Sequence, residues 1–142
     1  MSEYITESLK QQIYSHFNKC CAYCLTATAL MPVTFECEHI IPRSAGGKTV
    51  FENLCLACPM CDRYKSNRQK IPDPQTQEVV SLYHPHLQKW IEHFDWNDGY
   101  TEILGLTAVG RVTIFALKMN RPELMRVRRM WVKMGEHPPS LK

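Results

Sequence analysis

The cysteines of this chain constrain its fold more than any other feature. Seven occur in 142 residues, which is an odd number, at Cys20, Cys21, Cys24, Cys37, Cys55, Cys58 and Cys61. The polar N-terminal stretch MSEYITESLKQQ lacks the apolar segment of a secretion signal, so a disulfide framework is not expected. Metal binding is the better explanation for so many thiols.

Four of the cysteines form two C-x-x-C motifs, at positions 21 and 24 and at positions 58 and 61. This spacing lets successive thiolates converge on one tetrahedral zinc ion, with Zn–S distances of about 2.3 Å. Four ligands would close the coordination shell, so we expect a structural zinc site made of Cys21, Cys24, Cys58 and Cys61.

Two alternatives to this ligand set remain open in the sequence. Cys20 could replace Cys21, and Cys55 forms a further C-x-x-C with Cys58. Cys55 lies between two leucines of an expected strand, where a small buried thiol is usual, and Cys37 is interpreted in the same way.

The segment between the two motifs has the pattern of two strands followed by a helix. Residues 33–41 alternate as a strand with one buried face, residues 42–49 form a glycine-containing loop, and residues 53–58 form a second short strand. A helix is expected to begin at Pro59 and to carry basic residues. An earlier helix over residues 6–18, capped by Thr6, precedes the first motif.

The C-terminal half has a different organisation. Residues 71–78 contain two prolines and are expected to be a linker, and Asn97-Asp98-Gly99 predicts a hairpin turn. One helix is expected from Thr107, and a last one should have Asn120 as its N-cap and end at Gly135. We therefore expect a core with an N-terminal helix over residues 1–70. An extension over residues 71–142 should pack on it as one domain.

Charge and hydropathy limit the classes of function. The net charge is +3, and no apolar run reaches the roughly 20 residues that span a bilayer, so a cytoplasmic protein without a membrane partner is expected. Basic residues gather over positions 62–70 and again over 121–133. In the second cluster Arg126, Arg129 and Lys133 share a helix face, which is either solvated or a second nucleic-acid contact. His84, His86 and His93 are expected to be structural or surface residues.

The residues around the second motif complete a larger pattern. Residues 38–47 read EHIIPRSAGG, residues 53 and 54 are Asn-Leu, and residues 58–65 read CPMCDRYK. This arrangement resembles the HNH endonucleases, over a stretch from about Cys21 to Asn67. Their pattern is acid-His-Ile-x-Pro-x-Ser-x-Gly-Gly, then Asn-Leu, then Cys-x-x-Cys-Asn-x-x-Lys. The sequence departs from it in having Glu rather than the commoner Asp at position 38, and Asp rather than Asn or His at position 62.

The resemblance implies an α+β fold. Its centre would be a ββα-metal (His-Me finger) core bracketed by the four-cysteine zinc site, with a C-terminal β-hairpin and a two-helix extension. It further implies an endonuclease, a hydrolase of DNA phosphodiester bonds, in which His39 activates water. Glu38 and Asp62 would hold a catalytic Mg²⁺ or Mn²⁺, for which carboxylates are suitable hard ligands. Asn53 would hold the loop after the His39 strand by hydrogen bonds.

The same resemblance predicts that basic residues near this site bind the phosphates of a nucleic acid. Phosphate contacts are expected from Arg43, Lys48, Arg63, Lys65 and Arg68. The alternative is a zinc-stabilised nucleic-acid-binding module that does not cleave, but Glu38, His39 and Asp62 are all retained, which favours the nuclease. DNA is expected as the partner rather than RNA, and the oligomeric state is left open.

Overall fold

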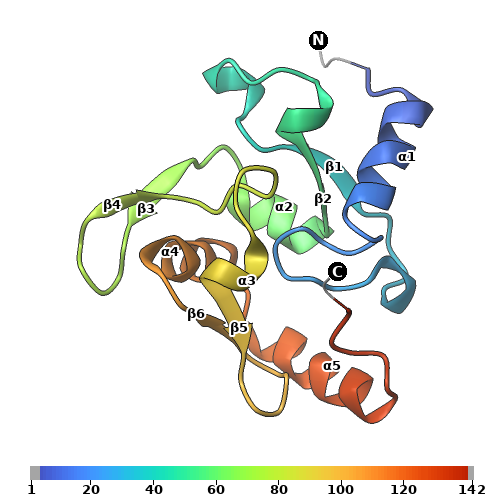
Figure 1. The fold of residues 1–142 in the computed structure, drawn as a ribbon, viewed down its shortest axis with the longest axis vertical. Helices are drawn as coiled ribbons and strands as arrows, with labels where there is room; N and C mark the ends of the chain where they lie inside the picture. The colour runs from blue at the N-terminus through green and yellow to red at the C-terminus, as the bar shows by residue number, and fades with distance from the viewer. Residues whose placement is uncertain (1–3, 141–142) are drawn as a thin grey trace. The chain divides into compact units, whose positions relative to one another are not determined.

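The computed structural model describes residues 4–140, and it has the mixed α+β composition that the sequence predicts. The chain forms two compact units (Figure 1). The first contains the described residues up to Arg68 together with His84–Leu87, and the second contains Gln69–Tyr83 and the described residues from Gln88 onward.

The first unit contains the predicted order of two strands followed by a helix. Helix α1 (Glu7–His16) comes first, and the Thr6 side chain caps it by accepting the Leu9 N–H at 3.1 Å. Strands β1 (Glu36–His39) and β2 (Leu54–Ala57) pair antiparallel, and helix α2 (Pro59–Lys65) follows directly. Short 3₁₀ turns lie at Thr28–Leu30, Arg43–Ala45 and Phe51–Asn53. The ββα arrangement expected for the core is therefore present.

Strand β1 is shorter than predicted, and its burial differs from the predicted alternation. Phe35 and Glu38 are buried, whereas Val33 is exposed and Cys37 is half-buried. The interior side of β1 thus carries a carboxylate, opposite the fully buried Cys55 in the strand register. The predicted buried thiol is correct for Cys55 and wrong for Cys37.

The outer edge of β2 is covered by two hydrogen bonds from other segments. The Leu56 carbonyl accepts the Ala22 N–H at 2.7 Å, and the Leu54 carbonyl accepts Nε2–H of His86 at 2.7 Å. The His86 ring also stacks on His16, with ring centroids 5.0 Å apart. His86 is therefore a structural residue that ties the segment His84–Leu87 to the first unit.

The second unit consists of two hairpins and three helices among the described residues. Its elements are β3 (Lys70–Pro72), β4 (Val79–Ser81), α3 (Trp90–His93), β5 (Phe94–Trp96), β6 (Ile103–Gly105), α4 (Ala108–Leu117) and α5 (Pro122–Lys133). Strands β3 and β4 pair antiparallel, so the prediction of a linker over residues 71–78 is wrong. Pro72 is tolerated because it is the last residue of a strand in a two-stranded sheet.

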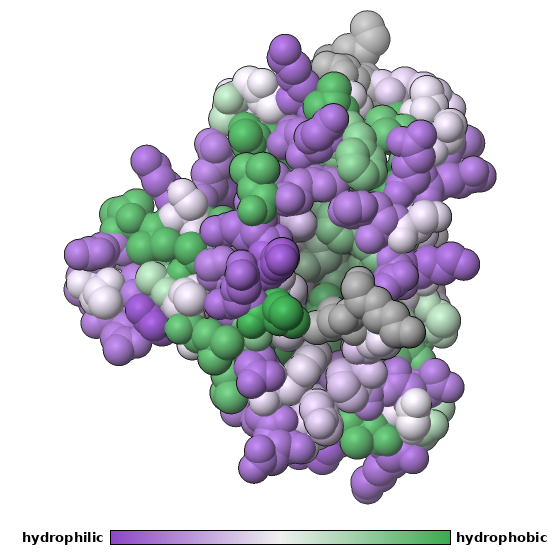
Figure 2. All heavy atoms as spheres, viewed as in Figure 1, coloured by the Kyte–Doolittle hydropathy of each residue, from purple (hydrophilic) through white to green (hydrophobic). Residues whose placement is uncertain are grey.

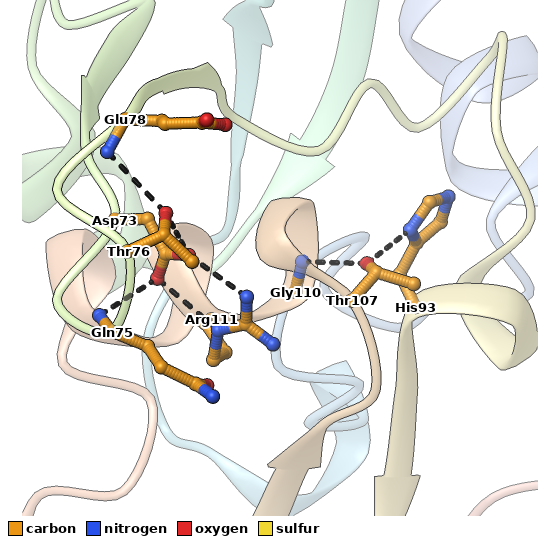
Figure 3. Close-up of polar contacts among 8 residues, drawn as sticks. All are labelled: Asp73, Gln75, Thr76, Glu78, His93, Thr107, Gly110 and Arg111. Atoms are coloured by element: carbon orange, nitrogen blue, oxygen red, sulfur yellow. Dashed lines mark hydrogen bonds and ion pairs between the residues drawn. The ribbon is translucent and has the colours of Figure 1, made fainter.

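The loop between β3 and β4 is organised by the carboxylate of Asp73 (Figure 3). It accepts the Gln75 N–H at 3.2 Å and the Thr76 hydroxyl at 2.9 Å. Two further bonds come from Arg111 on α4, from Nε at 3.1 Å and from Nη2 at 2.8 Å. These bonds, chiefly those from Arg111, hold the pKa of Asp73 well below its usual range.

This lowered pKa gives an expected dependence of stability on pH. In the unfolded chain Asp73 regains a pKa of about 3.9, so its contribution is present above about pH 4 and is lost as the pH falls below that value. We expect Asp73→Asn to lower the melting temperature at pH 7, and we expect its difference from the wild type to shrink progressively as the pH falls from about 4 toward 2. The check is thermal unfolding of both proteins across this range, with the exposed Asp98→Asn as the matched control. A difference that stays constant with pH would contradict the assignment.

The second hairpin and helix α4 follow the sequence predictions, except that the turn of the hairpin is longer than Asn97-Asp98-Gly99. The turn that begins at Asn97 runs to residue 102, and the Asn97 side chain accepts the Thr101 and Glu102 N–H groups at 2.9 and 3.1 Å. Helix α4 begins directly after Thr107, close to the predicted start. Thr107 is its N-cap, and its hydroxyl accepts the Gly110 N–H at 3.1 Å. His93 Nδ1 lies 2.7 Å from the same hydroxyl (Figure 3).

The predicted N-cap of helix α5, Asn120, is wrong by one residue. Arg121 is the N-cap, and the Asn120 side chain instead binds the N–H and carbonyl of Ile103, at 2.7 and 2.8 Å. Arg128 is fully buried and donates to the carbonyls of Met119 and Thr101 at 2.7 and 2.9 Å. It is therefore a structural residue and not part of an exposed basic cluster.

Helices in the described part of the chain are all too short or too polar to cross a membrane. The face drawn in Figure 2 carries hydrophilic side chains with smaller hydrophobic areas between them.

Candidate active site and metal centres

The four cysteines of the two C-x-x-C motifs meet in the interior of the first unit. The Sγ atoms of Cys21, Cys24, Cys58 and Cys61 all lie within 4.8 Å of one another, and the four residues are buried. None of these four cysteines forms a disulfide, and Cys24 Sγ lies 3.8 Å from Cys58 Sγ. A buried group of four soft thiols has the donor set of a closed structural zinc site, so this cluster could hold zinc.

Local backbone structure brings the thiols together. In the first motif the Cys21 N–H binds the Thr26 carbonyl at 2.8 Å, and Leu25 adopts a positive φ of 62° so that the chain turns back. In the second motif Cys58 is the N-cap of α2, and its Sγ accepts the Cys61 N–H at 3.5 Å. The turn in each motif is thus held by a hydrogen bond between residues that are close in the sequence.

The other cysteines lie outside this cluster. Cys55 Sγ points to the Tyr23 hydroxyl at 3.6 Å and to Glu38 Oε2 at 3.9 Å. Cys20 Sγ donates to the Asn18 carbonyl at 3.4 Å. Neither belongs to the set of thiols that converge, so the geometry favours Cys21 over Cys20 and Cys61 over Cys55.

A pocket of about 470 Å³ opens along β1 and α2 and contains the residues of the acid–His motif. Its lining includes Glu38, His39 and Asp62, which the sequence predicts to act together. The remaining lining residues are Glu36, Cys37, Pro42, Arg43, Ser44, Arg63, Ser66 and Asn67. Strand β1 supplies Glu38 and His39 side by side, and α2 supplies Asp62 from its first turn.

The two carboxylates of the pocket lie close to each other. Burial raises the pKa of Glu38 to about 8; Lys65 opposes the rise, and Asp62, which is within hydrogen-bonding reach, adds to it. Two adjacent carboxylates repel each other when both are ionised, and a cation between them would remove that cost. The donor set is hard oxygen, so these residues fit a divalent ion such as Mg²⁺ or Mn²⁺ that keeps several waters.

His39 is half-buried and is held by a residue that the sequence interpretation did not include. Its Nε2 lies 2.8 Å from the hydroxyl of Thr49, in the loop after β1. If Nε2–H donates to this hydroxyl, the neutral imidazole has its lone pair on Nδ1, where it can accept a proton. A threonine ten residues from a histidine gives no signal in the sequence, because loop geometry alone brings the two together.

Asn53 holds this loop against the strand end. Its Oδ1 accepts the Ile41 N–H at 2.8 Å, and its Nδ2 donates to the carbonyls of Ile41 and Lys48 at 3.1 and 2.9 Å. Gly47 allows the close approach, since a Cβ there would lie 1.8 Å from the Ile41 carbonyl oxygen. The structure therefore contains the hydrogen bonds that a positioning role for Asn53 requires.

Replacing Asn53 tests this role. We expect Asn53→Ala to destabilise the first unit by about 2–4 kcal/mol, because it removes three hydrogen bonds from an almost fully buried side chain. Asn53→Asp should be worse, because an anionic oxygen would then face the Ile41 and Lys48 carbonyls. Chemical denaturation of both variants measures the effect, and an Asp variant as stable as the wild type would contradict it.

The five basic residues predicted to contact phosphates do not have equal access to solvent. Arg43 and Arg63 are exposed and line the pocket, and Lys48 and Arg68 are exposed elsewhere in the unit, with Arg68 bonded to the Tyr64 carbonyl. Lys65 is 1% exposed. This burial does not favour Lys65 as one of the predicted phosphate contacts.

Comparison with known proteins agrees with the motif found in the sequence. Residues 21–68 match the family model described as HNH endonuclease, about a third of the chain. No curated protein and no solved structure matches the chain. The matched segment contains both C-x-x-C motifs, the Glu38-His39 pair, Asn53 and Asp62, so the resemblance predicted from the sequence is confirmed. An HNH domain implies a nuclease or nucleic-acid-binding function, and over this third of its length the chain is similar to HNH endonucleases.

Proposed function

We propose that this protein is a metal-dependent endonuclease that hydrolyses phosphodiester bonds of DNA. The observation that carries the proposal is the pocket of the ββα unit, where two neighbouring carboxylates, Glu38 and Asp62, and the imidazole of His39 share one lining. Hydrolysis of a phosphodiester needs a base for the attacking water and stabilisation of negative charge at the phosphate.

Glu38 and Asp62 are the residues that would hold the divalent ion. When bound, Mg²⁺ or Mn²⁺ stabilises negative charge on the phosphate oxygens and on the leaving oxygen. Glu38 comes from a strand and Asp62 from the first turn of α2, so the two carboxylates are fixed by separate elements. A site built on such elements is held more firmly than one built on loops.

His39 takes the proton of the attacking water in this proposal. Thr49 holds Nε2, and Asn53 fixes the loop on which Thr49 lies by binding the Lys48 carbonyl. The neutral imidazole can then accept a proton at Nδ1. Water activation by a positioned histidine contributes roughly 10²–10⁴ in rate.

Exposed arginines at the pocket would hold the DNA backbone. Arg43 and Arg63 are on two sides of the lining, one after β1 and one on α2, and their guanidinium groups can bind phosphate oxygens in pairs. Contacts of this kind carry no sequence information and weaken with salt. A structural zinc ion in the four-cysteine cluster would anchor both the first motif and the start of α2, and thereby the position of Asp62.

The experiment is cleavage of supercoiled plasmid DNA by zinc-loaded protein, with Mg²⁺ or Mn²⁺ added in separate reactions. Conversion to nicked or linear DNA that requires the added ion supports the proposal, and a parallel reaction with single-stranded RNA decides the substrate. DNA binding without cleavage in the presence of either ion would favour the alternative function, a zinc-stabilised module that binds nucleic acid and does not cleave it. If the protein shows neither DNA binding nor cleavage, both hypotheses are refuted.

A further inference from the structure

Lys65 is a cation in the interior of the first unit. Its side chain is 2% exposed, and its Nζ lies 3.7 Å from Oε1 of Glu38, whose side chain is 6% exposed. Lysine is almost never fully buried unless it is paired, because removing an ammonium group from water is costly. The pair with Glu38 therefore accounts for the burial of both side chains.

The same ammonium group has a second contact on β1. Lys65 Nζ donates to the His39 carbonyl at 3.4 Å. The Ile40 N–H bonds to the Asn53 carbonyl. Successive residues of an antiparallel strand point their backbone polar groups to opposite sides, so the carbonyl of His39, one residue earlier, points away from β2. Lys65 thus contacts the two residues of β1 that the proposed mechanism needs, the Glu38 side chain and the His39 carbonyl.

The helix that carries Lys65 also carries Asp62 and Arg63. Lys65 is the last residue of α2, one turn after Asp62, and it faces inward, whereas Arg63 is exposed at the pocket. A cation at the C-terminal turn also interacts favourably with the helix dipole. Lys65 therefore joins the end of α2 to β1 and so connects the elements that supply Glu38, His39 and Asp62.

We propose that Lys65 is a positioning residue for the active site and not a nucleic-acid contact. Its buried ammonium group holds the Glu38 carboxylate and the His39 backbone in register with Asp62. This inference rests on the proposed nuclease function for its effect on the reaction, but its structural part, the coupling between Lys65 and Glu38, can be measured without any substrate.

The first test is a double-mutant cycle of thermal stability in zinc-loaded protein without other metals, at about pH 9 so that the Glu38 carboxyl is ionised. Lys65→Met leaves the Glu38 carboxyl buried without its cation, and we expect the melting temperature to fall by roughly 10 °C. Adding Glu38→Gln removes the other partner, and the double variant should recover a clear part of the loss. If Lys65→Met does not fold, recovery of soluble folded protein by the second substitution supports the proposal in the same way. Additive losses, or no recovery, would overturn it.

The second test separates positioning from phosphate binding, with Arg63→Met as the matched variant on the same helix. Binding to a labelled duplex is measured without divalent ions as a function of sodium chloride concentration. Arg63→Met should reduce the salt slope by about 1, whereas Lys65→Met should leave the slope unchanged. In cleavage assays, Lys65→Met should lower kcat by about tenfold or more with little change in KM.

The outcomes of the two tests are distinct. A salt slope that falls for Lys65→Met as much as for Arg63→Met would overturn the proposal, because it would make Lys65 a phosphate contact. If the wild type neither binds nor cleaves nucleic acid, the proposed function fails. The stability cycle still decides in that case whether Lys65 and Glu38 act as a pair.

Discussion

Loss of one cysteine from the four-thiol cluster is expected to unfold the first unit. Structural zinc contributes on the order of 10 kcal/mol to small domains, which is comparable to the whole free energy of unfolding of a typical domain. In Cys61→Ser the hydroxyl is a poor ligand for zinc, and the remaining thiols, Cys21, Cys24 and Cys58, would hold the ion weakly. We therefore expect zinc content to fall from about one ion per chain to well below one, together with loss of the part of the helical circular dichroism that comes from α1 and α2 at room temperature.

The chain supplies good controls for this experiment. Cys37→Ser changes a half-buried thiol outside the cluster, so it should keep both zinc and fold. All three tryptophans, Trp90, Trp96 and Trp131, belong to the second unit, so their fluorescence reports on that unit. Unfolding of the first unit should therefore change circular dichroism more than it changes tryptophan fluorescence. A Cys61→Ser protein with wild-type zinc content and melting temperature would disprove a structural zinc site.

The features that could be predicted from the sequence are those whose residues lie close together along the chain. A C-x-x-C turn is held by hydrogen bonds between residues close in the sequence, which is why the spacing of Cys21 and Cys24 was sufficient to identify a knuckle. The predicted cap at Thr6 acts on an N–H group three residues later, and the predicted start of α4 near Thr107 is also set by a contact three residues long. The order of β1, β2 and α2 followed from short segments of alternating and helical pattern, and these were correct.

The features that were missed depend on partners far away in the sequence. The β3–β4 loop is fixed by Arg111, 38 residues beyond Asp73, so its proline-rich sequence alone indicated a linker. Asn120 has the sequence context of a helix cap, but its side chain binds Ile103, 17 residues earlier. Lys65 looks like any surface lysine of a basic helix until the position of Glu38, on another element, is known.

The candidate site likewise has features that the sequence predicts and features that depend on distant contacts. The residues that meet at the candidate site could be predicted because the motif fixes residue types at set positions. The charge environment could not be predicted, because the raised pKa of Glu38 depends on burial and on Asp62 and Lys65, which come from α2. The same holds for the contact of Thr49 with His39, which depends on the path of the loop.

Removal of the His39 imidazole is expected to abolish most of the cleavage activity while leaving the fold intact. His39→Ala deletes the only imidazole among the residues that line the pocket, so the rate with Mg²⁺ or Mn²⁺ should fall by roughly 10²–10⁴. The side chain is half-buried and has the Thr49 hydroxyl as a hydrogen-bond partner, so the loss of stability should be small, about 1 kcal/mol. DNA binding should persist, since the exposed arginines are unchanged.

The measurement is single-turnover cleavage of a labelled duplex by wild type, His39→Ala and His16→Ala, each with its zinc content verified. His16 is an exposed histidine of α1 that does not line the pocket, so its variant should cleave at the wild-type rate. Added imidazole should partly restore cleavage by His39→Ala, because a small base can enter the space that the side chain leaves. If His39→Ala folds, binds DNA and cleaves as fast as His16→Ala, His39 is not the general base, and water must be activated by another group of the pocket.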